Sequence, residues 1–359
     1  MEKPTAIVVG TGFGCRVHVP ALRAAGFAVA ALVGTRPDRL ERKAAEAGVP
    51  AFFTDLGAAI ERTGAHLVTI GAPPASHAPL AFAAMARGCH VLCEKPFAMD
   101  AAEGAALLDA AERAGIVHMI AHEFRWLPER ALLGRAIAEG LIGTPRFLAM
   151  DQFIPFCADP GARLPGWWFD TASGGGWLGA GGSHLIDQVR TWLGEFESVS
   201  ARLLTVSDRE NGADDSYSLR FRLASGAEGS MQQSAGAWGA PASLLRCAGT
   251  RGTVWIESGK VLLADRTGTR ELPVPDDLVL PAAPGFELAP FIRLCEALRA
   301  RIEGAGGEGP VAIPTFRDGL AAMRVMDAVR ASSAAGGALR PVEPASGLEP
   351  ASGPGGGAA

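Results

Sequence analysis

Short apolar runs alternate with helix-like segments over the first 122 residues. The apolar runs are rich in valine, isoleucine, leucine and alanine, and they cover residues 6–10, 27–34, 51–53, 66–71, 90–96 and 116–122. Strands that alternate with helices in this way are typical of a parallel sheet covered by helices. We therefore predict an α/β domain over residues 1–122.

Two of the helices between these runs carry clear end signals. The segment Pro37–Ala47 stops before Gly48, and glycine is favoured just after the last helical residue. The segment 100–114 begins at Asp100, a favoured N-cap residue, and stops at Gly115. We predict a helix over each segment.

The alternation of strand-like and helix-like segments ends after residue 122. A helix near 128–139 is followed by a long extended run and then by strand-like segments that succeed one another through short turns; these segments cover 198–207, 216–224, 227–236, 243–249, 252–258 and 260–265. Strands at this spacing predict a large, open and mostly antiparallel sheet. Helical patterns return near 286–303 and 315–332. We assign residues 123–343 to a second, α+β domain and predict that 344–359, rich in glycine, proline and alanine, form a disordered tail.

Composition excludes several classes of protein. The net charge of −5 is spread without long basic runs, which argues against nucleic acid as a partner. The longest apolar stretches fall short of the ~20 residues of a membrane-spanning helix, and the first apolar run is too short for a signal peptide. The six cysteines show no metal-binding spacing, so we expect no metal and a reduced, cytoplasmic environment.

The first strand runs into a glycine-rich turn. Gly10, Gly12 and Gly14 stand between the strand and the following helix, with Phe13 among them and Cys15 at the position where the dinucleotide motif has its third glycine. Such a turn lets backbone N–H groups and a helix N-terminus hold a pyrophosphate. The alternative is an ordinary glycine turn of another α/β protein, but the place of the motif at the first strand favours dinucleotide binding.

The end of the second strand bears on which dinucleotide is bound. An acidic residue there would accept a hydrogen bond from the ribose 2′-OH, whereas this chain has Thr35 and Arg36. A hydroxyl and a guanidinium suit a 2′-phosphate, so NADP is favoured, with NAD as the second choice. The alternative interpretation is that Arg36 lies in a solvated loop.

The segment after the fourth strand contributes further candidates. Ala72 and Pro73 follow the carboxyl end of that strand, where ligands bind in such sheets, so we expect them to line the cofactor. His77 is included with them, although we favour its interpretation as a plain residue of the next helix's first turn.

Several motifs together resemble one known family. They are the opening glycine turn, "PPASHAPLAFAAMARGCHVLCEKP", "EFRWLP", "GLIGTPRF" and the block "GGGWLGAGGSHLID". In this combination the chain resembles the Gfo/Idh/MocA oxidoreductases, which include glucose–fructose oxidoreductase and inositol dehydrogenases. The resemblance covers nearly the whole chain and implies an N-terminal Rossmann domain followed by a domain whose open sheet often forms the oligomer interface.

The resemblance also implies roles for individual residues. Lys95 of the Glu-Lys-Pro motif would reach the nicotinamide and the substrate, its bond to Pro96 would be cis, and Glu94 would contact the cofactor's ribose. His184 corresponds to the family's acid/base histidine. The aspartate of the family's D-x-G-x-H pattern falls on Ala180, which cannot transfer a proton.

Other residues are candidates for contacting the substrate. We predict a helix over 183–193 that carries His184 in its first turn, where the helix dipole would keep the imidazole neutral. Asp187 would share a face with His184 and orient it or bind a substrate hydroxyl; the alternative is pairing elsewhere. Arg125 contacts the substrate or braces the two domains, and Trp168 lines a ring-shaped substrate or belongs to an aromatic core.

These observations predict a nicotinamide-dependent oxidoreductase acting on a sugar, polyol or related cyclic alcohol or ketone. The glycines around Trp177 would let the backbone approach the nicotinamide and substrate. Two rivals remain: a glycoside-cleaving enzyme that oxidises its substrate transiently, and a non-catalytic dinucleotide-binding sensor. The strand-rich region has more apolar alternation than one helix layer covers, so we expect a homodimer or homotetramer.

Overall fold

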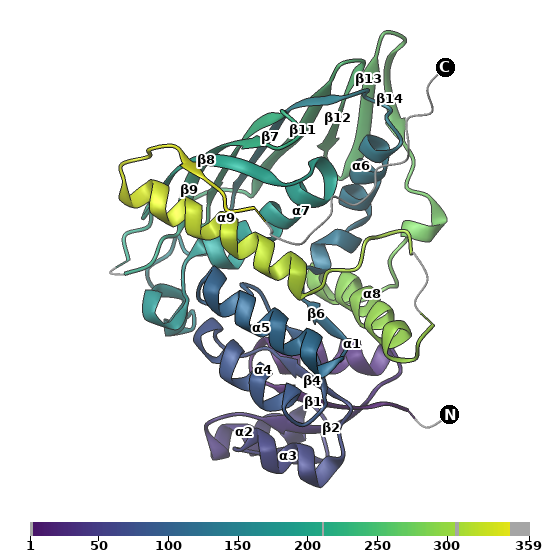
Figure 1. Ribbon diagram of the computed structural model, residues 1–359, viewed down its shortest axis with the longest axis vertical. Coiled ribbons are helices and arrows are strands. Elements are labelled where there is room, and N and C mark those ends of the chain that lie inside the picture. The colour runs from purple at the N-terminus through teal and green to yellow at the C-terminus, as the bar shows by residue number, and fades with distance from the viewer. Residues whose placement is uncertain (1–2, 210–211, 306–308, 345–359) are drawn as a thin grey trace.

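Two sheets stacked along the long axis organise the molecule, as the computed structural model in Figure 1 shows for residues 3–209, 212–305 and 309–344. The predicted disordered tail lies, except for Pro344, outside the described residues. None of the helices in these ranges combines the length and the apolar character needed to cross a bilayer.

The first sheet has six parallel strands. They are β1 (Thr5–Val9), β2 (Ala28–Val33), β3 (Ala51–Phe53), β4 (Leu67–Ile70), β5 (His90–Cys93) and β6 (His118–Ile120). Their order is β3-β2-β1-β4-β5-β6, so the direction in which strands are added reverses between β1 and β4. Ligands of such sheets bind beyond the carboxyl ends of the strands at this point of reversal.

Helices cover both faces of this sheet. They are the π-helical turn η1 (Gly14–His18), α1 (Val19–Ala24), α2 (Pro37–Glu46), α3 (Leu56–Thr63), the 3₁₀ turn η2 (Pro74–Ser76), α4 (His77–Met85) and α5 (Ala101–Ala114). The predicted end signals are confirmed. The Asp100 side chain accepts a hydrogen bond from the backbone N–H of Glu103, and Gly48 and Gly115 have the left-handed backbone that favours glycine.

The second sheet has nine strands in the order β14-β13-β12-β11-β7-β10-β9-β8-β15. Its strands are β7 (Pro145–Phe153), β8 (Phe196–Leu204), β9 (Ser216–Leu223), β10 (Glu228–Ser234), β11 (Ala242–Gly249), β12 (Gly252–Glu257), β13 (Lys260–Asp265), β14 (Gly268–Leu272) and β15 (Arg340–Pro341). Apart from the parallel pair of β7 and β10, neighbouring strands run antiparallel. The predicted fold class, an α/β Rossmann-type domain followed by an open and mostly antiparallel sheet, is confirmed.

Helices lie against one face of this second sheet and leave the other open. The second half of the chain forms α6 (Pro128–Ala138), α7 (Ser183–Leu193), α8 (Gly285–Ile302) and α9 (Phe316–Ala334), with short helical turns η3 (Glu123–Trp126), η4 (Gly166–Phe169), η5 (Thr171–Ser173), η6 (Leu178–Gly182) and η7 (Asp276–Leu278). In Figure 1, α9 lies between the two sheets, with β8 of the second sheet on one side and α5 on the other. The open face presents Phe147, Phe153 and Leu244, each more than two-fifths exposed.

The helix α8 belongs to the first sheet in space, although we assigned its residues to the second domain. Phe291, Leu294 and Leu298 are fully buried in the core that Val8 and Leu22 line on the first sheet's side. Periodicity shows that a helix has an apolar face, but it does not show which sheet that face covers. This contact places α8 beside the first sheet, while its assignment to the second domain stays a prediction.

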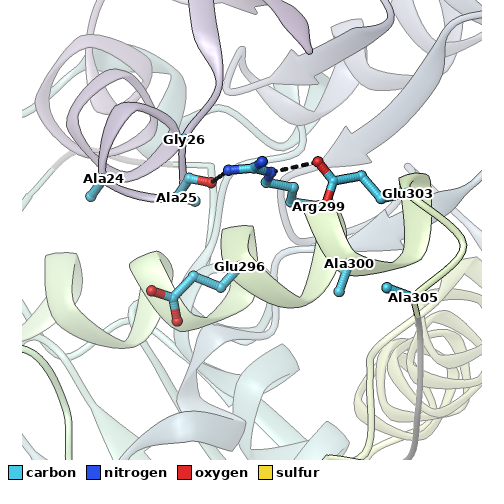
Figure 2. A pocket seen from close by; sticks show the side chains of 8 residues that line it. All are labelled: Ala24, Ala25, Gly26, Glu296, Arg299, Ala300, Glu303 and Ala305. Carbon is cyan, nitrogen blue, oxygen red and sulfur yellow. Dashed lines mark hydrogen bonds and ion pairs between the residues drawn. The ribbon is translucent and has the colours of Figure 1, made fainter. Parts of the chain in front are cut away.

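Polar contacts reinforce the docking of α8. Arg299 donates from Nη1 to the carbonyl oxygen of Ala25 and from Nε to Glu303, as Figure 2 shows. The depression of about 360 Å³ at this place lies just before β2 begins, at the amino edge of the sheet. It is therefore at the opposite edge from the carboxyl ends, where a ligand of this fold binds.

Candidate active site

The turn after β1 has the close packing that a dinucleotide site requires. Gly10 has a φ of +109°, and a Cβ there would run into the carbonyl oxygen of Gly71, which follows β4. A Cβ on Gly14 would lie 2.9 Å from Val8 Cγ1, so Gly14 lets the helix approach the strand. A Cβ on Gly12 would meet open space. The turn is thus closed toward the protein and open at Gly12, where a pyrophosphate can approach the backbone.

A basic surface lies beside the end of β2. Thr35 and Arg36 are exposed there, next to a depression of about 370 Å³. The residues lining this depression are Arg36, Asp38, Arg39, Arg42 and Lys43. Within the described ranges, Arg36 and Arg39 form no ion pair, whereas Arg42 and Lys43 pair with Glu46. Two guanidinium groups are therefore left to meet an anion at this place.

His77 joins the loops that follow β4 and β5. Its side chain is fully buried, with Nδ1 2.9 Å from the carbonyl oxygen of Pro96 and Nε2 2.9 Å from that of Ala72. Both ring nitrogens are therefore occupied by the protein's own backbone. These contacts support the favoured interpretation of His77 as a residue of the next helix's first turn, since it holds the loop that carries Ala72 and Pro73 as the first residue of α4. A contact between His77 and the cofactor stays a prediction.

Glu94 is held by a histidine that we had not singled out. Its Oε1 lies 3.0 Å from Nε2 of His18, and both side chains are buried. Burial opposes ionisation, but the hydrogen bond and charge of His18 prevail and lower the pKa of Glu94. The carboxylate is thus fixed beside the glycine-rich turn. A contact between Glu94 and the cofactor's ribose stays a prediction.

Lys95 crosses from the first domain to the segment that carries His184. Its Nζ donates a hydrogen bond of 2.9 Å to the carbonyl oxygen of Ala180, and the Lys95–Pro96 peptide bond is cis. Ala180 stands where the family pattern has an aspartate, so the backbone at this position supplies the acceptor that the side chain lacks. The ammonium group is directed toward η6, which leads into α7.

The glycine run lets this segment pack closely against the first domain. A Cβ on Gly174 would lie 2.5 Å from Pro74, and one on Gly179 would lie 3.1 Å from Pro96. The glycines therefore approach the loops after β4 and β5. The predicted approach to nicotinamide and substrate stays a prediction, because the contacts in the structure are with protein.

His184 lies on a buried aromatic surface. Its ring stacks on Phe124 at a centroid distance of 3.9 Å, and its Nε2 lies 3.8 Å from Oε1 of Glu123. Its Nδ1 is buried and has no partner among the described residues. An imidazole held flat, with a nitrogen toward a carboxyl group, is suited to receive and release a proton.

Burial and a neighbouring charge lower the pKa of His184, whereas we expected the helix dipole to keep the imidazole neutral. Burial lowers its pKa well below the ordinary value, and the positive charge of Lys95 lowers it further. The predicted helix Ser183–Leu193 has the expected bounds, but it continues from the π-helical turn η6. His184 is therefore not at the start of the helical segment. Burial and Lys95 favour the neutral imidazole, and an effect of the helix dipole stays a prediction.

Two further polar residues of this cluster escaped the sequence analysis as site residues. His122 follows β6, and neither of its buried ring nitrogens forms a hydrogen bond in the described part of the chain, although Nε2 lies 3.9 Å from Oδ1 of Asp187. Oε2 of Glu123 is likewise buried without a hydrogen bond there. Burial, with the neighbouring charge of Glu94, raises the pKa of Glu123 to about 8. The signal that could have found them is their place just beyond a parallel strand, the same kind of place that Lys95 occupies.

Arg125 and Asp187 bind one another. Arg125 donates from Nε and Nη2 to the two carboxylate oxygens of Asp187, at 2.7 and 2.5 Å, and also binds Asp318 and the carbonyl oxygen of Ala312. Arg125 and Asp187 are nearly fully buried. Their hydrogen-bonding groups are thus engaged within the protein, which favours the bracing interpretation over the predicted substrate contacts. Because its carboxylate is held by Arg125, Asp187 also fits the alternative of pairing elsewhere better than that of orienting His184.

Trp168 belongs to an aromatic group over the same region. Its ring centroid lies 4.9 Å from Phe156, 5.1 Å from Trp167 and 6.2 Å from Trp177. Trp168 is only partly buried, so one face of this group remains accessible. Stacking on a sugar ring stays a prediction for Trp168.

The residues present fit a bound nicotinamide dinucleotide. Gly12 leaves open space for the pyrophosphate, Arg36 and Arg39 are free to meet a phosphate, and Lys95 and His184 meet beyond the carboxyl ends of β4 and β5. Within the described residues, no group of three or more His, Cys, Asp or Glu side chains is arranged to hold a metal ion.

Comparison with known families gives two matches. Residues 5–122 match the model of the GFO/IDH/MocA oxidoreductase family with its NAD-binding Rossmann fold. Residues 131–255 match the model of the GFO/IDH/MocA C-terminal domain. Together the two models account for more than half of the chain.

Individual relatives are more distant. A levoglucosan dehydrogenase of Pseudarthrobacter phenanthrenivorans is 33% identical over 52% of this chain and 53% of its own, and a D-xylose 1-dehydrogenase (NADP(+)) of Haloferax volcanii is 30% identical over 63% and 68%. The chain thus matches about half the length of the first curated relatives. A solved levoglucosan dehydrogenase in complex with NADH and levoglucosan has a TM-score of 0.84, with 26% identity and coverage of 95% of this chain and 99% of that one.

Proposed function

Because the chain belongs to the GFO/IDH/MocA family of oxidoreductases, we propose that it is a dehydrogenase that transfers a hydride between NADP and a sugar, polyol or related cyclic alcohol. The observation that carries the proposal is the convergence of buried His184 and Glu123 with half-buried Lys95 beyond the carboxyl ends of the first sheet's strands. Relatives named for levoglucosan and D-xylose support a sugar substrate.

Each part of the site has a definite task in this reaction. The bound dinucleotide supplies the hydride acceptor. The turn from Gly10 to Gly14 would hold its pyrophosphate through backbone N–H groups. Lys95, fixed by the carbonyl of Ala180, would donate a hydrogen bond to the substrate oxygen, and neutral His184 would take the hydroxyl proton. Trp168 would form an apolar wall for the sugar ring.

The preference for NADP is the finer part of the proposal. Arg36 and Arg39 have no ion-pair partner in the described part of the chain, and they line the depression beside the end of β2. A guanidinium that binds a 2′-phosphate strengthens binding by roughly tenfold or more. We expect Arg36→Ala to reduce affinity for NADP and to leave affinity for NAD nearly unchanged. Fluorescence titration of both dinucleotides measures this, and tighter binding of NAD by the native protein would contradict it.

Assembly and location extend the proposal. Phe147, Phe153 and Leu244 are exposed apolar side chains on the uncovered face of the second sheet, where Asp151 and Arg246 also lie, and a second copy of the chain would cover this face in a homodimer or homotetramer. We propose a cytoplasmic location, which the lack of a disulfide among the six cysteines, all in the described residues, supports.

A substrate screen tests the proposed activity against its rivals. Levoglucosan, D-xylose and a panel of sugars and polyols would be incubated with each dinucleotide and followed by nicotinamide absorbance and by product analysis. A dehydrogenase gives an absorbance change equal to the product formed. A glycoside-cleaving enzyme releases an aglycone without a net absorbance change, and a sensor gives neither signal while still binding the dinucleotide.

A further inference from the structure

Glu123 is the carboxyl group that accompanies His184. It begins η3 directly after His122, it is 2% exposed, and its Oε1 lies 3.8 Å from Nε2 of His184. Its Oε2 is buried without a partner among the described residues. A buried carboxyl oxygen without a hydrogen bond destabilises the folded protein, so the position of Glu123 beside the histidine calls for an explanation.

The substitution at position 180 supplies that explanation. Where the family pattern has an aspartate, Ala180 offers only a backbone carbonyl, and Lys95 occupies it. In the described part of the chain, Glu123 is the one carboxylate within ion-pair distance of His184. The carboxyl group beside His184 therefore comes from Glu123 in the turn after β6, and not from position 180 in the turn before α7.

The surrounding charges invert the usual order of proton affinity in this pair. The charged and titratable groups around Glu123 and His184 come from several elements. They are Glu94 and Lys95 in the loop after β5, His122 directly before η3, Arg130 in α6 and Glu287 in α8. Burial and Glu94 raise the pKa of Glu123 to about 8, whereas burial and Lys95 lower that of His184 well below its ordinary value. At neutral pH the carboxyl group of Glu123 is thus protonated and the imidazole of His184 is neutral.

We propose that Glu123 and His184 hold one proton between them and act as a single proton-transfer unit, with Glu123 supplying the carboxyl group missing at position 180. This inference rests on the proposed dehydrogenase function. Glu123 is a positioning residue, because it acts through His184. The separation of 3.8 Å exceeds a hydrogen bond, and contacts of this kind commonly tighten only when the substrate is bound.

The reaction balances as follows in the direction of alcohol oxidation. The deprotonated unit consists of a Glu123 carboxylate and a neutral His184. A bound dinucleotide would take up the hydrogen of the substrate's C–H bond together with its two electrons. The substrate's O–H bond breaks, and its proton passes to Nε2 of His184 and on to Oε1 of Glu123. A ketone and a neutral Glu123 carboxylic acid remain. Reduction runs the same transfer backward.

The pH dependence of kcat tests the inference. Oxidation needs the deprotonated unit, so kcat should rise about tenfold per pH unit below a pKa of about 8 and level off above it. Glu123→Gln keeps the shape but cannot accept the proton. It should lower kcat at about pH 9 by about 10²-fold with little change in KM, and remove the inflection. Glu123→Asp should retain the inflection, and the exposed Glu139→Gln is the matched control.

A second measurement does not depend on turnover. Infrared spectroscopy of the protein without ligands should detect a protonated carboxylic acid at neutral pH that disappears near pH 8 and is absent from Glu123→Gln. A Glu123→Gln enzyme with the native pH profile, or no carboxylic acid signal at neutral pH, overturns the inference and leaves the dehydrogenase proposal intact. A native protein that turns over no sugar or polyol overturns the proposed function, and the inference with it.

Discussion

Lys95 connects the two halves of the site through a single hydrogen bond to the carbonyl of Ala180. Lys95→Met keeps the aliphatic stem and removes the charge and the donor. We expect kcat to fall by about 10²–10⁴-fold, while the unfolding temperature changes little because one partly buried hydrogen bond is lost. Steady-state kinetics and thermal unfolding measure the two effects. Lys260→Met, an exposed substitution in the second sheet, is the control; near-native activity of Lys95→Met would refute the assigned role.

His184 is expected to act on turnover more than on binding. His184→Ala should lower kcat by about 10²–10⁴-fold, the range for a lost general acid or base, and leave cofactor affinity almost unchanged. The measurement is kcat and KM side by side, with a dinucleotide titration. If His184 only binds a substrate hydroxyl, the variant will instead show a raised KM with nearly native kcat.

The depressed pKa of His184 also affects stability. The buried imidazole is neutral in the folded protein, whereas in the unfolded chain it takes up a proton near its ordinary pKa. Its contribution is therefore fully present above about pH 6.5 and is lost as the pH falls below that value. Denaturant unfolding between pH 7 and 5 should show a steeper loss of free energy for the native protein than for His184→Gln. Equal slopes would contradict the buried, neutral state.

The sequence predicts those site residues that lie in a recognisable motif of neighbouring residues. Lys95 and His184 lie inside short motifs, so the chain alone nominated them. Glu123 and the pairing of Arg125 with Asp187 depend on contacts between segments about 60 residues apart. The spacing of residues in the chain does not reveal which side chains of two distant segments face each other, and Asp187 was therefore expected beside His184 on the strength of their shared helix.

At the scale of elements, Arg125 ties three helical segments together. It stands in η3 and binds Asp187 of α7 and Asp318 of α9. Removing one partner of a buried ion pair leaves an uncompensated charge, so Asp187→Ala should lower the free energy of unfolding by about 3–5 kcal/mol. The KM of the remaining folded enzyme should stay near native. Urea titration and kinetics measure this, with Asp277→Ala, which breaks the exposed pair with Arg135, as the control.

A raised KM with unchanged stability would reverse that assignment. It would restore the alternative in which Asp187 binds a substrate hydroxyl.

The helix that carries His184 shows where local reasoning succeeds and where it stops. Its bounds, Ser183–Leu193, follow from the pattern of apolar residues. The π-helical turn before it does not, because a run of glycines has no side-chain periodicity that could indicate a helix. The turn passes close to Pro96 at Gly179 and close to Tyr217 at Gly182, and both neighbours are distant in the chain.

At the scale of the molecule, the open face of the nine-stranded sheet predicts self-association. Light scattering at micromolar concentration should show a homodimer or homotetramer. Leu244→Asp, in the middle of that face beside Asp151, should shift the protein toward monomers, because a charge would be buried in the contact. The exposed Leu339→Asp, outside that face, should leave the assembly unchanged. A native protein that is monomeric at this concentration would rule out the idea.

The order of strands and helices gave most of the architecture before any contact was known. Alternation predicted the parallel sheet, and successive short strands predicted the second one. The parallel pairing of β7 with β10 escaped this reasoning, since β8 and β9 intervene in the chain. So did the placement of α8, because an apolar helix face fits either sheet.

That placement of α8 matters while the protein is being made. A nascent chain that has left the ribosome as far as residue 122 has all six strands of the first sheet but lacks the helix that buries Phe291, Leu294 and Leu298 against it. Part of one face of the first domain would therefore stay uncovered until about 180 further residues are synthesised, which takes roughly ten seconds or more at about 5–20 residues per second. Chaperones that shield apolar surfaces would meet this protein at that stage, and a gene cut after codon 122 would yield an aggregating fragment instead of a free-standing cofactor-binding module.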